Sequence, residues 1–98
     1  NSGYQAMNLA VLAGAARLVL LGFDCRETRP EVSHWFGDHP VRTEPSVFSA
    51  MRAHFERAAP VLRELCVEVI NATAGSAIAC FARGTLDEEA ARLAAAAA

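Results

Sequence analysis

The chain has 98 residues, of which 53% are hydrophobic and 20% are charged, and its formal net charge is −2. This length allows one domain or part of one, and the high apolar content excludes an intrinsically disordered chain. The small negative charge predicts no nucleic-acid partner and no attraction to an anionic membrane, and no apolar run approaches the roughly 18 to 20 residues that span a bilayer.

The first predicted element is a helix over residues 2–13, which is apolar on almost every side. Ser2 is expected to cap its start, and Gly14 is expected to end it, because glycine readily adopts the left-handed conformation that follows many helices. A helix without a polar face is normally buried on most sides. We therefore expect it to be covered by a second copy of the chain, in a homo-oligomer, or by an N-terminal half of the domain.

A continuous aliphatic run over residues 18–21 follows, and Gly22 closes it. Runs of this length without polar alternation are typical of a strand buried on both faces of a parallel sheet. Helix, short link and strand form the second half of a right-handed β-α-β unit, so a first strand is expected ahead of Asn1. Residues 23–44 then predict a long loop, which Trp35 and Phe36 would pack against the protein.

The second half of the chain begins with a predicted helix over residues 46–65, which Pro60 is expected to kink or split. A strand over residues 67–70 follows, with Glu68 at a partly exposed position or a sheet edge. Residues 78–81 are expected to form a short strand or a single helical turn. A capping box at Thr85 and Glu88 begins the last helix, which runs to Leu93.

This order of helices and strands is typical of an α/β protein. We expect a three-layer Rossmann-like parallel sheet flanked by helices. The sequence then forms either a single domain over residues 1–98 or the C-terminal half of a larger, Rossmann-like domain.

The three cysteines, Cys25, Cys66 and Cys80, predict no disulfide framework and no zinc site, because their number is odd and none forms a C-x-x-C pair. Cys66 and Cys80 lie in or beside apolar runs and are expected to be buried and inert. Cys25 has Arg26 beside it but no adjacent histidine, so we do not expect it to act as a nucleophile. Reduced thiols indicate a cytoplasmic protein.

Candidate binding residues lie where the two strands end, because parallel α/β sheets bind ligands beyond the carboxyl ends of their strands. The start of the first helix should lie on the same rim, and its free N–H groups and dipole suit a phosphate or a carboxylate. The candidates are Ser2 and Gly3 at the helix start, Asp24 after the first strand, and Asn71, Thr73 and Ser76 after the second. The last three are also ordinary turn formers, which is the alternative interpretation.

Two histidines of the long loop, His34 and His39, are candidates for a general base or a phosphate partner. A solvent-exposed loop position is the alternative for both. Their separation is not the i, i+4 spacing of a helical zinc pair, so no metal site is predicted. The sequence also lacks the glycine patterns of dinucleotide and P-loop sites, so no cofactor is predicted.

Three segments together resemble one family pattern: residues 1–15, beginning Asn-Ser-Gly-Tyr; residues 18–24, ending Gly-Phe-Asp; and residues 67–76, followed by Phe81. They are similar to the C-terminal half of the Rossmann-like domain of bacterial family-42 sialyltransferases and of 6-hydroxymethylpterin diphosphokinase-like proteins. The likeness is nearest to small phage and prophage proteins of this type. It covers about residues 1–90.

The resemblance implies that Ser2 and Gly3 contact a nucleotide-sugar or another phosphorylated small molecule. It also implies a loop histidine as general base, with His39 the first candidate and His34 the second. Where the family has a phosphate-binding tyrosine, this sequence has Cys25. The first hypothesis is a transferase-like binding domain that is inactive as a 98-residue piece. The alternatives are a non-catalytic phage-encoded accessory or structural protein and a protein-interaction module that uses the Trp35 loop.

Overall fold

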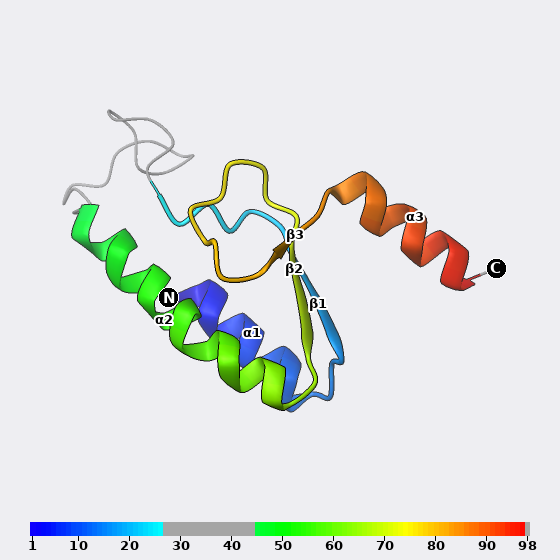
Figure 1. Cartoon of the computed structure of the whole chain (residues 1–98), viewed down its shortest axis with the longest axis horizontal. Helices are drawn as coiled ribbons and strands as arrows, with labels where there is room; N and C mark the ends of the chain where they lie inside the picture. Colours follow the sequence, from blue (N-terminus) through cyan, green and yellow to red (C-terminus); the bar gives the residue numbers. More distant parts are fainter. Residues whose placement is uncertain (27–44, 98) are drawn as a thin grey trace.

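The computed structural model describes residues 1–26 and 45–97, which contain three helices and a small parallel sheet (Figure 1). The elements in chain order are α1 (Ser2–Leu12), β1 (Arg17–Leu20), α2 (Pro45–Glu64), β2 (Glu68–Asn71), β3 (Ala82–Arg83) and α3 (Leu86–Ala97). This is a small α/β fold, as the order of the predicted elements indicates.

The sheet has the strand order β1-β2-β3, and both neighbouring pairs are parallel. Leu18 lies opposite Val69, so the predicted parallel pairing of the two apolar runs is confirmed. The third strand differs from the prediction. Residues 78–81 form neither a strand nor a helical turn, because Ile78 turns into the core and the chain pairs with β2 only from Ala82 onward.

The start of α1 also differs from the prediction in its cap. Asn1, and not Ser2, is the N-cap, since its Oδ1 accepts a hydrogen bond from the Tyr4 N–H at 3.2 Å. Both residue types cap helices well, so the sequence alone did not separate them. The predicted stop is confirmed: Gly14 has φ +96° and donates its N–H to the Val11 carbonyl at 3.0 Å.

The second helix runs without a break through Pro60, so the expected split does not occur. An interior proline removes one hydrogen bond of the helix, and its ring clashes with the carbonyl one turn earlier, at a cost of about 3 kcal/mol or more. Pro60 is itself exposed, whereas its neighbours Ala59 and Leu62 are buried. Packing of this buried face against the rest of the molecule stabilises the helix on both sides of the proline.

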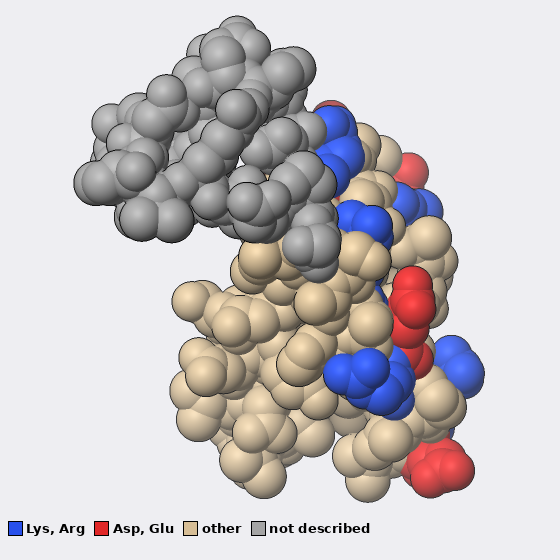
Figure 2. Space-filling model, turned by 90° about the vertical axis from the view of Figure 1, so that its left-hand side faces the viewer, with Lys and Arg blue, Asp and Glu red and all other residues tan. Residues whose placement is uncertain are grey.

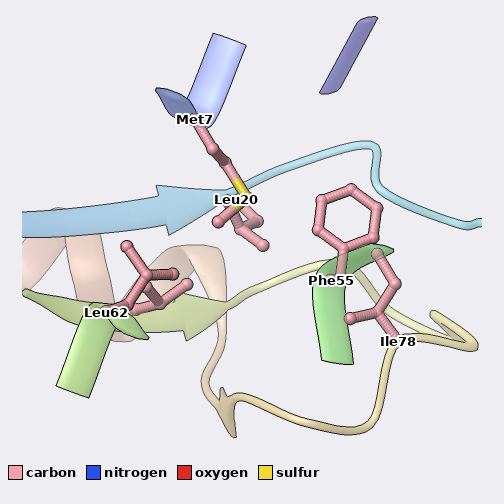
Figure 3. Packing of buried hydrophobic residues seen from close by; sticks show 6 residues of the cluster. Met7, Leu20, Phe55, Leu62 and Ile78 are labelled. Carbon is pink, nitrogen blue, oxygen red and sulfur yellow. The ribbon is translucent and has the colours of Figure 1, made fainter. Parts of the chain in front are cut away.

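The core lies between the sheet and the two helices α1 and α2, which lie side by side on one side of the sheet (Figure 1 and Figure 3). Its buried side chains are Met7, Leu20, Phe55, Leu62, Val69 and Ile78. Alternation along β1 explains this arrangement: Leu18 and Leu20 face the core, while Arg17 and Val19 face away.

The first helix is less covered than its apolar sequence predicts. Met7 is its buried residue, while Leu9 and Leu12 are 67% and 75% exposed. Within residues 1–26 and 45–97, nothing covers the outer side of α1. The expectation that a second copy or a further part of the domain covers it therefore stays a prediction.

The third helix lies on the other side of the sheet (Figure 1) and is anchored by Arg17. Arg17 Nη2 donates to both carboxylate oxygens of Glu89, at 2.7 and 2.9 Å, and Nη1 lies 2.5 Å from Glu68 Oε1. The predicted helix start is confirmed, because Thr85 Oγ1 accepts the Glu88 N–H at 3.1 Å. Two ion pairs of Arg17 thus join β1 to β2 and to α3.

Acid is expected to weaken this anchor. The hydrogen bond from Arg17 lowers the pKa of the Glu68 carboxyl group in the folded state. A lowered pKa stabilises the fold above the ordinary glutamate value, and this contribution is lost as pH falls through the folded-state value. We expect the free energy of unfolding to fall between pH 7 and about pH 3, and Glu68→Gln to reduce that fall.

Urea denaturation at the two pH values measures this effect. Glu64→Gln is the matched control, because Glu64 is exposed and forms no ion pair with a described residue. An equal pH dependence in the Glu68→Gln variant and the native protein would contradict the prediction.

Candidate functional site

A hollow of about 200 Å³ lies at the carboxyl end of β1, against the first turn of α1. Asn1 and Gly3 line it from α1, and Phe23, Asp24 and Cys25 line it from the segment after β1. The sequence predicted that three regions lie at the carboxyl edge of the sheet. Two of them, the start of α1 and the segment after β1, lie together around this hollow. The remaining walls come from Gly22, from α2 and from Ile78.

Gly3 has a packing role in this wall. A Cβ atom at position 3 would lie 2.7 Å from Cε2 of Phe23, so only glycine lets the aromatic ring lie directly on the helix. Ser2 is exposed at the same turn. The Tyr4 N–H of this turn binds the Asn1 cap, whereas the N–H groups of Ser2 and Gly3 have no carbonyl one turn earlier to bind and so face a ligand position.

The loop after β2 is organised by Asn71, which is fully buried. Its Nδ2 donates to Ser76 Oγ at 3.0 Å and to the Ile78 carbonyl at 3.1 Å. Its Oδ1 accepts the Thr73 N–H at 3.1 Å. Both polar atoms of the Asn71 side chain thus form hydrogen bonds within the loop that follows β2.

Two hydroxyl groups join this loop to the end of β1. Thr73 Oγ1 accepts the Phe23 N–H at 3.0 Å and donates to the Leu20 carbonyl at 3.3 Å. Ser76 Oγ donates to the Phe23 carbonyl at 2.5 Å and accepts the Ile78 N–H at 3.1 Å. Both side chains are buried. Their contacts favour the turn-forming interpretation over direct ligand binding.

Three arginines also lie at the carboxyl edge of the sheet. The sequence did not predict them as binding residues. Arg26 Nε donates to the Gly75 carbonyl at 2.7 Å, and Arg83 Nη2 donates to the Ser76 carbonyl at 2.7 Å. Arg52 Nη1 donates to the carbonyl of Cys25, in the wall of the hollow, at 3.1 Å. In the described part of the chain, neither Arg52 nor Arg83 forms an ion pair with a carboxylate.

Asp24 and Cys25 are the two other chemically notable residues of the wall. Asp24 is half-buried, and its carbonyl accepts the Ala77 N–H at 2.8 Å. Burial raises the pKa of the Cys25 thiol more than the charge of Arg52 lowers it, so the thiol stays protonated near neutral pH.

The other sequence candidates lie outside this edge or outside the described residues. His34, Trp35, Phe36 and His39 belong to the segment 27–44, which the structure does not describe. Cys66 is exposed with φ +60°, contrary to the expectation of burial, because it forms the left-handed turn that ends α2. Cys80 is partly buried, and burial raises its thiol pKa.

Among residues 1–26 and 45–97, no three His, Cys, Asp or Glu side chains are grouped so that they could hold a metal ion. No helix in the same residues has the length and apolar character needed to cross a membrane. Comparisons of the sequence with family models, with curated proteins and with solved structures find no match.

Proposed function

We propose that this chain is part of a three-layer Rossmann-like domain that binds a phosphorylated small molecule at the carboxyl edge of its sheet. The main support is the gathering of Arg26, Arg52 and Arg83 on the loops of this edge. The three come from the segment after β1, from α2 and from β3, so only the folded chain brings them to one edge. A nucleotide-sugar is the ligand class that the family resemblance favours.

The positive charges of the three arginines at the carboxyl edge of the sheet suit a ligand that has an anionic group at one end. Guanidinium groups offer several N–H donors in a planar fork, which matches the oxygens of a phosphate. The first turn of α1 adds unpaired N–H groups and the positive end of a helix dipole, which together favour an anion by about 0.3–1 kcal/mol.

Asp24 gives the hollow a second kind of contact. A carboxylate repels a phosphate but accepts hydrogen bonds from hydroxyl groups. A molecule that carries a phosphate at one end and hydroxyls at the other, such as a nucleotide or a sugar phosphate, fits this division. The apolar walls formed by Phe48, Met51 and Phe55 suit the face of a base or a sugar ring.

A transferase-like reaction is the more specific form of this proposal. His39, or else His34, would take the proton from an acceptor hydroxyl as general base. This role comes from the family resemblance and from the residue type. We expect no turnover from these 98 residues alone, and a cytoplasmic location is part of this proposal.

A non-catalytic accessory or structural protein is the second candidate. The observation that favours it is the internal use of Asn71, Thr73 and Ser76, whose side chains hold the fold together. Under this alternative, the arginines stabilise loop carbonyls and bind no ligand.

Titration calorimetry with cytidine and uridine monophosphates, and with inorganic phosphate, separates the two candidates. It is done on the complete polypeptide in which this chain occurs. We expect Arg52→Gln and Arg83→Gln each to weaken nucleotide binding by about 5- to 10-fold, as loss of one partly exposed charged hydrogen bond implies. Arg63→Gln is the control, because Arg63 is exposed near the opposite end of α2.

The pH dependence of binding tests the histidine in the same titration. If His39 pairs with the phosphate as a cation, affinity falls as pH rises above about 6.5, and His39→Ala abolishes that fall. Absence of nucleotide binding, or equal affinities in all variants, would favour the non-catalytic candidate.

A further inference from the structure

We infer that the groove between α1 and α2 binds the helix α3 of a second copy of this chain. The sequence left open what covers α1, and it predicted no partner for α3. The groove and the hollow at the carboxyl edge share no lining residue, so the inference does not depend on the proposed function.

The groove has a volume of about 190 Å³ and lies between the two helices that cover one side of the sheet (Figure 1). Met7 and Leu62 line it and are buried, whereas Val61 and Leu65 line it and are more than half exposed. Figure 2 looks onto the side on which α1 and α2 lie, and a broad area of it is free of charged side chains. Apolar surface of this kind gains free energy when protein covers it.

Helix α3 carries an apolar stripe that its own chain leaves exposed. Glu89 is the buried residue of this helix, whereas Leu86 and Leu93 are 56% and 71% exposed. Positions three or four residues apart lie on the same side of a helix. By this spacing, the stripe contains Leu86, Ala90, Leu93, Ala94 and Ala97, all of which are exposed. The helix therefore has a free surface of the kind that packs against other helices.

The groove of the same copy is out of reach of this stripe. The sheet lies between α3 and the two helices that form the groove, and Figure 1 shows α3 pointing away from them. Residues 84 and 85 alone link β3 to α3, which is too short a connection to pass around the sheet. The stripe and the groove can therefore meet only between two copies.

The stripe and the groove match in length, size of side chain and charge. α1 has 11 residues and α3 has 12, so the groove and its occupant are of nearly equal length. The alanines of the stripe allow a close approach of the helices. Arg57 is the charged residue among the described walls of the groove, and α3 begins with the acidic residues Asp87 and Glu88. Opposite charges at the rim of a contact favour one direction of docking.

Each copy has one groove and one stripe, so two copies can satisfy both surfaces at once. Each copy then places its α3 in the groove of the other, as an amphipathic helix binds a hydrophobic groove. The same two surfaces are used on both copies, which is the arrangement of a closed, two-fold symmetric dimer.

Sedimentation velocity of the complete polypeptide, over a range of protein concentrations, tests the inference. We expect a reversible equilibrium between monomer and dimer. Leu93→Glu in the stripe and Val61→Glu in the groove are each expected to raise the dissociation constant at least ~100-fold, because each places an unpaired carboxylate in an apolar contact. Ala95→Glu is the matched control, since Ala95 is exposed on the side of α3 away from the stripe. All three positions are exposed, so circular dichroism is expected to show an unchanged fold.

A mixture of the two variants tests whether α3 is the bound element. In a mixed pair, the Val61→Glu copy supplies a native α3 and the Leu93→Glu copy supplies a native groove, so one of the two contacts is restored. We expect the mixture to form more dimer than either variant alone at the same total concentration.

Three results would overturn the inference. The first is a polypeptide that stays monomeric at every concentration. The second is a dimer that either variant leaves unchanged, because the groove and the stripe would then not both take part in the contact. The third is a mixture that forms no more dimer than its components. None of these results bears on nucleotide binding.

Discussion

Replacement of Asn71 by alanine is expected to lower the free energy of unfolding by about 3–4 kcal/mol. The side chain is fully buried and makes three hydrogen bonds to the loop that follows β2. Alanine would leave the Thr73 N–H and the Ile78 carbonyl without these partners. Buried groups that lose their partners cost about 1–3 kcal/mol each. Urea denaturation followed by circular dichroism measures the change.

Two variants show whether the loss comes from this network. Asn71→Asp keeps the acceptor for the Thr73 N–H but loses both donated bonds, so we expect an intermediate loss of stability. Asn8→Ala changes the same residue type at an exposed position of α1, where we expect less than about 0.5 kcal/mol. A loss below about 1 kcal/mol in Asn71→Ala would contradict the structural role assigned to this side chain.

The same substitution tests how the loop affects the candidate site. Ser76 binds both Asn71 and the Phe23 carbonyl, so it links the β2 loop to the segment that lines the hollow. Asn71→Ala is expected to weaken nucleotide binding as well as stability. Asn71 acts here by positioning other groups, because its own polar atoms are all bonded within the fold.

The sequence predicted those parts of the fold that short-range patterns determine. The two apolar runs without polar alternation predicted parallel strands, and the structure pairs Leu18 with Val69. Gly14 and Thr85 predicted a helix end and a helix start from local backbone chemistry. These features depend on residues close together in the chain.

The parts that the sequence did not predict depend on contacts between distant residues. β3 contains only Ala82 and Arg83, which have no apolar pattern, and it is a strand because β2 lies beside it. Pro60 does not end α2, because the buried face of that helix outweighs one lost hydrogen bond. No local pattern indicates either result.

The candidate site shows the same division. Polar residues after the two strands were predicted at the carboxyl edge, and Asp24 lies in the wall of the hollow there. Their residue types did not reveal that Thr73 and Ser76 bind the backbone of the β1 segment. The arginines at positions 26, 52 and 83 are far apart in sequence, so only the folded chain shows that they share one edge.

Replacement of Phe55 by alanine is expected to cause the largest loss of stability, about 3–5 kcal/mol. The ring is 2% exposed and lies edge-on to the rings of Tyr4, Phe23 and Phe81, with centroid distances of 5.9, 5.9 and 6.5 Å. It therefore joins α1, the segment after β1 and the segment before β3 at one point of the core. The cost combines lost apolar burial with the cavity that remains.

Phe55 also lines the hollow. Phe55→Ala therefore changes the shape of the candidate site without changing its charge. Phe55→Leu keeps much of the volume, and we expect it to cost about half as much as alanine. Phe48→Ala is the matched control, because Phe48 lines the same hollow from α2 but is only partly buried. If Phe48→Ala weakens nucleotide binding with little effect on stability, while Phe55→Ala lowers both, the hollow is the binding surface and Phe55 supports it from within the core. If Phe48→Ala leaves binding unchanged, the ligand contacts the arginines outside the hollow.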